Sequence, residues 1–190
     1  MKIQFPIRKL DNFDFFAFFE NAFTSEECEK IKEMFTDLHD GTVGHKEQTN
    51  EVIRKSLVQF IDPSEKTSWI FERFYQFAIG CNEARWRFQL SGFYEGIQLT
   101  QYDQNGSHYD WHIDSGNAEF SIRKLSLILL LDDPQSYDGG ELEFVGLREK
   151  VKKKKGTLLL FPSYMGHKVH PVTGGMRHSA VAWISGEPYK

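Results

Sequence analysis

The sequence predicts an α+β protein, mainly β, in which helices near the N-terminus brace an antiparallel barrel or sandwich. Apolar residues recur at helical spacing within the first 84 residues, whereas short apolar or alternating runs separated by turn-rich stretches follow from residue 85. Aromatic residues make up 15% of the chain, with 17 Phe, which indicates a well-filled interior. Helices followed by many strands are typical of an α+β protein.

The first helix is predicted from its N-terminal capping signal. Thr24 is followed three residues later by Glu27, a capping box in which each side chain bonds the backbone N–H of the other residue. The helix is expected to end near Gly41. Before it, the aromatic residues 13–19 predict a buried strand that leads into the helix.

A second strand and a second helix are expected before residue 85. Residues 52–61 alternate loosely and predict a strand, and residues 62–64 then open a helix that is expected to end at Gly80. The later strands are expected at 86–90, 95–102, 125–131, 142–145, 157–161 and 179–184, with turns at 103–106, 137–140 and 173–175.

Length and charge limit the organisation of the chain and its partners. With 190 residues, one domain is expected, made of a helical and strand support region (1–84) and a β core (85–186). The formal net charge of −4 argues against a nucleic-acid partner. The Lys152–Lys155 run is expected to be a solvated hairpin tip, with a binding role as the alternative.

Cysteine usage and hydropathy favour a cytoplasmic protein with no membrane partner. Cys28 and Cys81 form no CxxC or CxxH pattern, so neither a disulfide framework nor a zinc knuckle is expected, and a reduced compartment is the simpler interpretation. No run of eighteen apolar residues and no signal-peptide pattern is found.

The first candidate metal-binding pattern is His112-Ile113-Asp114. Residues two apart on a strand face the same side, so this imidazole and carboxylate are expected to project together. An Fe(II) site with two His and one carboxylate keeps three positions open, and the pair supplies two of these three ligands. By itself the pattern is more typical of a surface or hydrogen-bonded pair.

A second imidazole is available in the segment that begins at His167. Both His167 and His170 are candidates, but a strand places them on opposite faces, so only one of them can face inward.

The same segment ends in a candidate anion-binding residue, Arg177. An Fe(II) oxygenase that uses 2-oxoglutarate needs a cation for the distal carboxylate of this cosubstrate, and arginine offers a planar bidentate fork. Ser179 lies on the same strand face and can add a hydroxyl, and Tyr102 ends an earlier strand from which its phenol can reach the cosubstrate.

Separated motifs, in order along the chain, resemble the PKHD-type branch of the prolyl 4-hydroxylase-like oxygenases. They are Gln101-Tyr102-Asp103, Tyr109 to Asp114, Leu125-Ser126, Asp133-Pro134 with Tyr137 to Leu142, and His167 to Arg177. The resemblance covers roughly residues 82–186, and Arg54-Lys55-Ser56 is similar to the family's N-terminal strand.

The resemblance implies a double-stranded β-helix (jelly-roll) core, Fe(II), 2-oxoglutarate and O2, with L-ascorbate as reductant. Carried over position by position, the metal ligands are His112, Asp114 and His167, and Arg177 is the anchor for 2-oxoglutarate. His167 is preferred over His170 because its ten-residue spacing to Arg177 is the family's.

The activity that the resemblance implies is that of a dioxygenase which hydroxylates its substrate and releases succinate and CO2. A prolyl residue in a peptide or protein is the expected substrate, and a free amino acid or another small molecule is the alternative. A non-catalytic, cupin-like jelly roll that binds a metal or ligand is an alternative of another class. Cupins generally use HxH, whereas this chain has His112-Ile113-Asp114.

Three residues near the expected ligand strand are tentative substrate contacts. His108 ends a polar loop that borders the expected entrance, and Tyr109 and Trp111 flank the ligand strand. An ordinary loop residue and ordinary packing aromatics are the alternatives for these positions.

Overall fold

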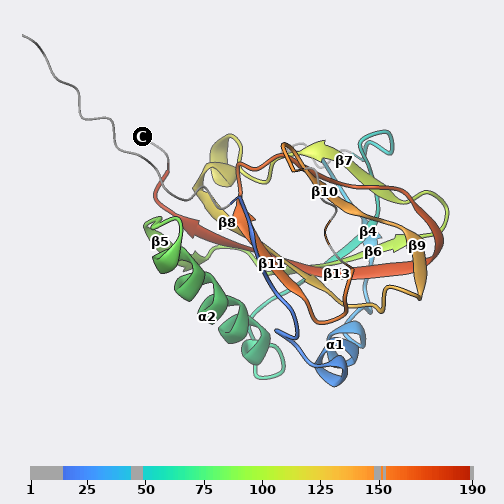
Figure 1. Cartoon of the computed structure of the whole chain (residues 1–190), viewed down its shortest axis with the longest axis horizontal. Helices are drawn as coiled ribbons and strands as arrows, with labels where there is room; N and C mark the ends of the chain where they lie inside the picture. The colour runs from blue at the N-terminus through green and yellow to red at the C-terminus, as the bar shows by residue number, and fades with distance from the viewer. Residues whose placement is uncertain (1–14, 44–48, 148–150, 152, 189–190) are drawn as a thin grey trace, which may run out of the picture.

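Residues 15–43, 49–147, 151 and 153–188 are described in the computed structural model, and their strands form two antiparallel sheets (Figure 1). The strands of the larger sheet are β1 (Ala17–Phe19), β2 (His39–Asp40), β4 (Leu57–Ile61), β5 (Leu90–Phe93), β6 (Ile97–Asp103), β8 (Arg123–Leu130), β9 (Tyr137–Gly139), β11 (Leu158–Pro162) and β13 (Val172–Gly186). Those of the smaller sheet are β3 (Arg54–Lys55), β7 (His108–His112), β10 (Leu142–Phe144) and β12 (His167–Val169). The larger sheet runs in the order β1-β11-β8-β13-β6-β4-β2, with β5 and β9 also paired to β13, and the smaller one in the order β10-β12-β7-β3.

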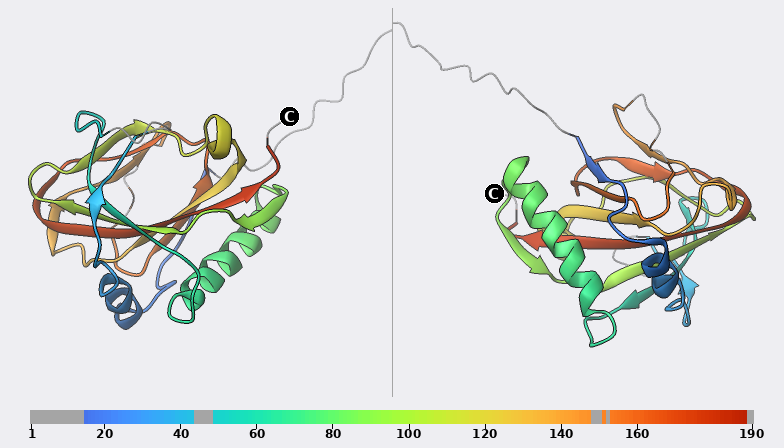
Figure 2. Two further views of the ribbon diagram at one scale, coloured as in Figure 1. Left: turned by 180° about the vertical axis from the view of Figure 1, so that it is seen from behind. Right: turned by 60° about the horizontal axis from the view of Figure 1, so that its bottom comes forward.

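The larger sheet separates two hydrophobic cores. Every residue of β8 is buried, because Leu127 and Leu129 pack toward the helices while Ile128 and Leu130 pack between the sheets. The helices α1 (Ser25–Lys32) and α2 (Ser68–Ala84) cover the outer core (Figure 2). The mainly β class with two bracing helices confirms the predicted fold class.

The first helix begins as predicted and ends earlier. Thr24 and Glu27 form the capping box, with both reciprocal hydrogen bonds present. The helix ends at Lys32 and not near Gly41, because the backbone that follows is bound elsewhere. The amide side chain of Gln59 in β4 accepts hydrogen bonds from the N–H groups of residues 36 and 37, each at 2.9 Å.

The second helix begins later than predicted and passes through its expected end. Helix α2 starts at Ser68, since residues 62–67 form a turn closed by a 2.6 Å hydrogen bond from the Thr67 hydroxyl to a backbone carbonyl. Gly80 lies inside the helix, where glycine costs about 1 kcal/mol relative to alanine. Ala78 and Cys81 on either side of it are buried in the outer core, so packing outweighs this cost. The strand expected at 86–90 begins only at Leu90.

One predicted strand is divided because the chain moves between sheets, and two predicted turns form parts of strands. The strand expected at 52–61 is divided at Ser56, so that β3 joins the smaller sheet and β4 the larger one. The expected turns at 137–140 and 173–175 contribute to β9 and β13, which pair with each other. A one-turn 3-10 helix, η2 (Ala118–Ile122), was not anticipated. The predicted division of the chain at residue 84 stays a prediction.

The described residues of the lysine run, 153–155, connect β10 of the smaller sheet to β11 of the larger one and therefore do not form a hairpin tip. Lys153, Lys154 and Lys155 form ion pairs with Glu141, Glu20 and Glu29, respectively. Lys152, the start of the strand expected at 13–19 and the predicted loop positions 44–48 lie outside the described residues. No helix in the described ranges is long and apolar enough to cross a membrane.

Candidate metal centre and its cavity

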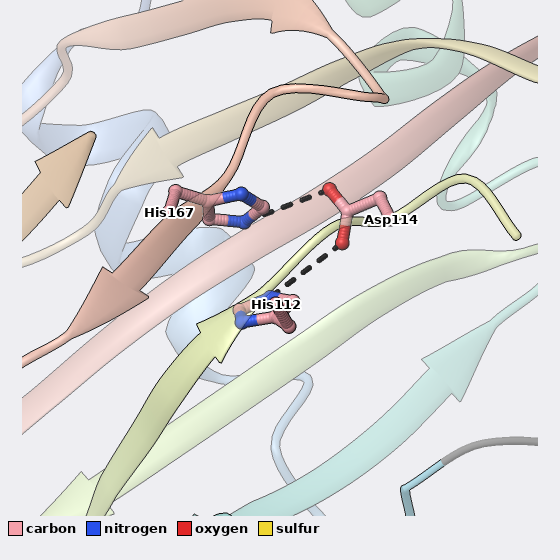
Figure 3. A group of neighbouring side chains, drawn as sticks. All are labelled: His112, Asp114 and His167. Atoms are coloured by element: carbon pink, nitrogen blue, oxygen red, sulfur yellow. Dashed lines mark ion pairs between the residues drawn. The ribbon is translucent and has the colours of Figure 1, made fainter. Parts of the chain in front are cut away.

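The structure brings His112, Asp114 and His167 together in a cavity between the sheets (Figure 3). His112 ends β7 and is paired across the smaller sheet with His167, the first residue of β12. Nε2 of His112 lies 3.6 Å from Oδ1 of Asp114, and Nε2 of His167 lies 3.7 Å from Oδ2. One candidate ligand atom from each residue lies within 4.8 Å of the other two.

Asp114 reaches this point from outside the strand. Because β7 ends at His112, the rule for residues two apart on a strand does not explain the position of the carboxylate. Its backbone N–H donates to the carbonyl of Ser163 at 2.9 Å, and its carbonyl accepts from Nη1 of Arg123 at 3.2 Å. Hydrogen bonds to distant segments therefore hold Asp114 beside the two imidazoles.

His170, the other candidate for the second imidazole, does not line the cavity. Its Nε2 lies 2.6 Å from a carboxylate oxygen of Glu143, and its side chain is 31% exposed. The geometry therefore brings His167, and not His170, to the cluster.

The two imidazoles of the cluster have their Nε2 lone pairs free for a metal. Nδ1 of His112 lies 2.8 Å from the carbonyl of Asp110, and Nδ1 of His167 lies 2.9 Å from that of Met165. A carbonyl oxygen only accepts hydrogen bonds, so the neutral form of either ring carries its proton on Nδ1 and leaves Nε2 for a metal.

Burial and neighbouring groups together set the charge states of His112 and Asp114. Burial lowers the pKa of His112 to about 4, and the adjacent His167 adds to the shift, so the His112 ring is neutral at pH 7. Burial alone would raise the pKa of Asp114, but the two histidines and the hydroxyl of Ser126 outweigh it and lower that pKa. The result is an ionised carboxylate beside a neutral imidazole.

A bulge in β7 turns Tyr109 into the cavity and Trp111 away from it. His112 pairs with His167 and Tyr109 pairs with Val169, so three steps in β7 match two steps in β12. Tyr109 consequently lines the cavity, whereas Trp111 is 43% exposed and lies under the ammonium of Lys168.

His108, like Trp111, is not among the residues that line the cavity. It belongs to β7 and not to a loop, and its two ring nitrogens face the carbonyls of Gly106 and Val52. The expected contact of His108 and Trp111 with substrate stays a prediction, which this cavity does not support.

Arg177 lies in the same cavity on β13, directly paired with Tyr102 of β6. Its side chain is 2% exposed, its Cζ is 5.1 Å from the centre of the Tyr102 ring, and its Nη1 donates to the hydroxyl of Ser179 at 3.3 Å. Nε of Arg177 has no hydrogen-bond partner among the described residues. A buried guanidinium with an unused donor is arranged to receive an anion.

Residues 97–185, which contain all of these side chains, match the 2OG-Fe(II) oxygenase superfamily. Over this segment the chain is similar to that superfamily. The family implies Fe(II) and 2-oxoglutarate, as the resemblance in the sequence predicted.

Relatives of this superfamily segment include PKHD-type hydroxylases. One from Prochlorococcus marinus (strain NATL2A) is 36% identical over 99 residues, which are 51% of this chain and 44% of that relative. One from Hyphomonas neptunium (strain ATCC 15444) is 44% identical over 92 residues, which are 45% of this chain and 41% of that relative. The chain thus spans less than half the length of these curated relatives.

Solved structures confirm the jelly-roll fold. A Pseudomonas putida prolyl-4-hydroxylase superposes with a TM-score of 0.71 at 22% identity, covering 91% of this chain and 93% of the other. A Trichoplax adhaerens prolyl hydroxylase, in complex with a fragment of the oxygen degradation domain of hypoxia inducible factor, gives a TM-score of 0.76 at 19% identity, covering 90% and 84%.

The residues of the cavity fit the groups that the superfamily implies. Two imidazole Nε2 atoms and one carboxylate are the ligand set of a non-haem Fe(II) site with open positions. The buried guanidinium of Arg177 suits the distal carboxylate of 2-oxoglutarate, with the Ser179 hydroxyl beside it. The cavity holds about 470 Å³, within the range of small-molecule sites.

Sequence reasoning missed the wall of the cavity formed by Glu95, Arg123 and Trp183. Arg123 forms an ion pair with Glu95, and its Cζ lies 3.7 Å from the centre of the Trp183 ring. These residues are far apart in the chain, and no local pattern joins them. The only available signal was the position of Arg123, at the start of an apolar strand where a charge is unusual.

Proposed function

We propose that the chain is an Fe(II)- and 2-oxoglutarate-dependent dioxygenase that hydroxylates a prolyl residue in a peptide or protein and releases succinate and CO2. One observation carries the proposal, namely that the His112, Asp114 and His167 cluster shares a single buried cavity with the guanidinium of Arg177. A metal-ligand set alone fits many chemistries, whereas a ligand set beside a buried cation suits a carboxylate cosubstrate.

Each residue has a defined task in this reaction. Nε2 of His112 and of His167 and the carboxylate of Asp114 would hold Fe(II), and the Nδ1 contacts of both rings and the lowered pKa of Asp114 suit this role. Arg177 would bind the distal carboxylate of 2-oxoglutarate. Bound Fe(II) would supply the redox chemistry that couples reduction of O2 to cosubstrate decarboxylation and substrate hydroxylation.

The surrounding side chains would orient the cosubstrate and exclude water. The Ser179 hydroxyl accepts a hydrogen bond from Nη1 of Arg177, and the buried ring of Tyr102 lies against the guanidinium. The ring of Tyr109 covers one face of the His112 imidazole. Exclusion of water by bound cosubstrate and substrate would strengthen each of these electrostatic contacts.

The prolyl substrate is supported by the names of the structural neighbours and by other side chains that line the cavity. Phe60 and Ile113 line the cavity and are 46% and 52% exposed, so the site has an apolar entrance. The paired Glu95 and Arg123 add hydrogen-bonding groups that suit a peptide backbone. A free amino acid or another small molecule remains the second candidate, because the cavity is also of small-molecule size.

The accompanying expectations are L-ascorbate as reductant, a cytoplasmic location and no nucleic-acid or membrane partner. They are predictions from the sequence and its resemblance. A cupin-like binding protein without oxygenase activity is the competing class, and it would show metal binding without conversion of 2-oxoglutarate.

The test is a succinate assay with Fe(II) and 2-oxoglutarate across proline-containing peptides, free amino acids and nucleic-acid oligomers. We expect slow succinate formation without substrate and faster formation with a prolyl peptide. His167→Ala should abolish both, whereas His170→Ala should retain them. If only a free amino acid accelerated succinate formation, a free amino acid would replace the prolyl residue as the proposed substrate. Absence of succinate with every compound would favour the cupin-like binding protein without oxygenase activity.

A further inference from the structure

We propose that Ser126 and Ser163 form a chain of two hydroxyl groups that positions Asp114 and leaves one carboxylate oxygen, Oδ1, for the metal. This inference rests on the proposed function, because it concerns the same metal centre. It assigns a positioning role to two serines that are outside the ligand set.

The two serines are fully buried, and their hydroxyl groups follow one another in successive contacts that end at the carboxylate of Asp114. Ser126 belongs to β8, and Ser163 directly follows β11. Oγ of Ser126 lies 2.6 Å from Oδ2 of Asp114 and 2.9 Å from Oγ of Ser163. Both serines are 0% exposed, so bulk water does not compete for these hydrogen bonds.

The chemistry of the three groups fixes the direction of the chain. An ionised carboxylate only accepts hydrogen bonds, and each serine hydroxyl has a single proton to donate. The Ser126 hydroxyl has two acceptors within reach, Oγ of Ser163 and Oδ2 of Asp114, and its single proton goes to Oδ2, which is closer and charged. The Ser163 proton is then left for the Ser126 oxygen. Hydrogen bonds in such a chain polarise one another, so the bond to the carboxylate is stronger than one from an isolated serine.

The hydroxyl chain makes the two carboxylate oxygens of Asp114 unequal. Each oxygen faces one imidazole, Oδ1 at 3.6 Å from Nε2 of His112 and Oδ2 at 3.7 Å from Nε2 of His167. Oδ2 also receives a short charge-assisted hydrogen bond, whereas Oδ1 accepts none from the described residues. A carboxylate with one oxygen occupied in this way favours ligation through the other oxygen alone. One-oxygen ligation keeps positions on the metal open for cosubstrate and O2.

The backbone of Ser163 holds the same loop independently of its side chain. Its carbonyl accepts from the N–H groups of Asp114 and Ser115, each at 2.9 Å, and its own N–H donates to the carbonyl of Lys124. Replacing the Ser163 side chain therefore removes the hydroxyl and leaves these backbone hydrogen bonds in place. The contribution of the hydroxyl chain can thus be separated from that of the loop.

The experiment titrates Co(II) into the full chain and into Ser126→Ala, Ser163→Ala and the double variant, following the visible spectrum of the bound ion. We expect Ser126→Ala to weaken Co(II) binding by about 10- to 100-fold and to change the spectrum, as losses of hydrogen bonds to metal ligands do. Ser163→Ala should weaken binding less, and the double variant should match Ser126→Ala, because Ser163 acts through the Ser126 hydroxyl.

Two further variants control for folding and for the loss of any buried hydroxyl. Ser126→Thr keeps the hydroxyl and should restore most of the affinity. Ser185→Ala removes a buried hydroxyl that has no partner among the described residues, and it should bind Co(II) like the original chain. Thermal unfolding without metal shows whether each variant is folded before its affinity is compared.

The outcomes separate this inference from the proposed function. Unchanged Co(II) affinity and spectrum in Ser126→Ala, with good binding by the original chain, would overturn the positioning role alone. If the losses of Co(II) affinity in the two single variants added up in the double variant, Ser126 and Ser163 would act independently, and the hydroxyl chain would be overturned. Failure of the original chain to bind Co(II) at all would overturn the proposed function together with the inference.

Discussion

Tyr109 and His112 stack with their ring centroids 3.5 Å apart, although they are three residues apart in β7. In a regular strand this spacing places side chains on opposite faces. The bulge opposite Val169 removes the alternation, so both rings face the cavity. The strand irregularity therefore supplies the imidazole with an aromatic neighbour.

The first prediction concerns this stack. Tyr109→Ala should lower kcat/KM by about tenfold or more, because an imidazole ligand without its neighbour is less precisely held. Tyr109→Phe keeps the stacked ring and should retain most of the activity. Steady-state succinate formation measures both variants. An equal loss in the two variants would assign the effect to the phenol and contradict the role of the stack.

The second prediction concerns the anchor for 2-oxoglutarate. Arg177→Gln removes the buried charge and should raise the KM for 2-oxoglutarate by about 100-fold, in line with charge-assisted hydrogen bonds of about 1.5–3 kcal/mol. Arg177→Lys keeps the charge but loses the planar fork, so its KM for 2-oxoglutarate should lie between those of the original chain and of Arg177→Gln. Co(II) affinity should change little in either variant. A KM unchanged in Arg177→Gln would place the cosubstrate elsewhere.

The third prediction concerns the space around the Arg177 side chain. Gly140 has φ +63°, and a Cβ there would lie 2.9 Å from Cδ of Arg177 and 2.9 Å from Cγ2 of Val172. Gly140→Ala should therefore displace the guanidinium and weaken 2-oxoglutarate binding measured by calorimetry.

Gly146 provides the matched control for this substitution. It also has a positive φ, +83°, but a Cβ at this position meets no atom within 4 Å. Gly146→Ala should show the backbone cost of a left-handed residue and keep the affinity for 2-oxoglutarate. If the two variants bound the cosubstrate equally well, displacement of Arg177 would be ruled out as the cause.

The fourth prediction concerns stability and pH. The buried carboxylate of Asp132 joins α1 to β13, because it is 2.8 Å from the ammonium of Lys32 and accepts from the backbone and ring of His178. Burial alone would raise the pKa of Asp132, but these partners lower it. The ionised form therefore stabilises the fold above the unfolded-state pKa of about 3.9.

The stabilisation by Asp132 should disappear as pH falls through its lowered folded-state pKa. Asp132→Asn should reduce the free energy of unfolding at pH 7 by about 1–3 kcal/mol. Urea unfolding at several pH values measures the difference between the variant and the original chain. We expect the difference to shrink below about pH 4, close to the pKa of an aspartate in the unfolded chain. A difference that grows toward acid pH would contradict the assignment.

Residue type and order along the chain were sufficient to predict which main side chains meet in the site. The His-Ile-Asp pattern, the later histidine and Arg177 meet in one cavity, as expected. Strand alternation does not explain the position of Asp114, however, because its backbone accepts from the Arg123 guanidinium and donates to the Ser163 carbonyl beyond the strand end. Such long-range contacts leave no local pattern.

The parts of the fold that could not be predicted depend on tertiary packing. Gly80 reads as a helix end, yet buried neighbours continue α2 to Ala84. The sequence offers Tyr109 and Trp111 alike as substrate contacts, yet the bulge turns only Tyr109 into the cavity. The lysine run reads as solvated, yet acidic residues from distant segments pair with its described members. Each case needs the partner segment, which one-dimensional spacing does not identify.

The central claim is that one cavity holds a metal through His112, Asp114 and His167 and a carboxylate cosubstrate through Arg177. The most direct measurement is an anaerobic calorimetric titration of 2-oxoglutarate into the chain with and without Fe(II), repeated with Arg177→Gln. The account predicts one equivalent bound tightly with Fe(II), much weaker binding without it, and weak binding in Arg177→Gln under both conditions. Equal affinity in all four titrations would contradict the account.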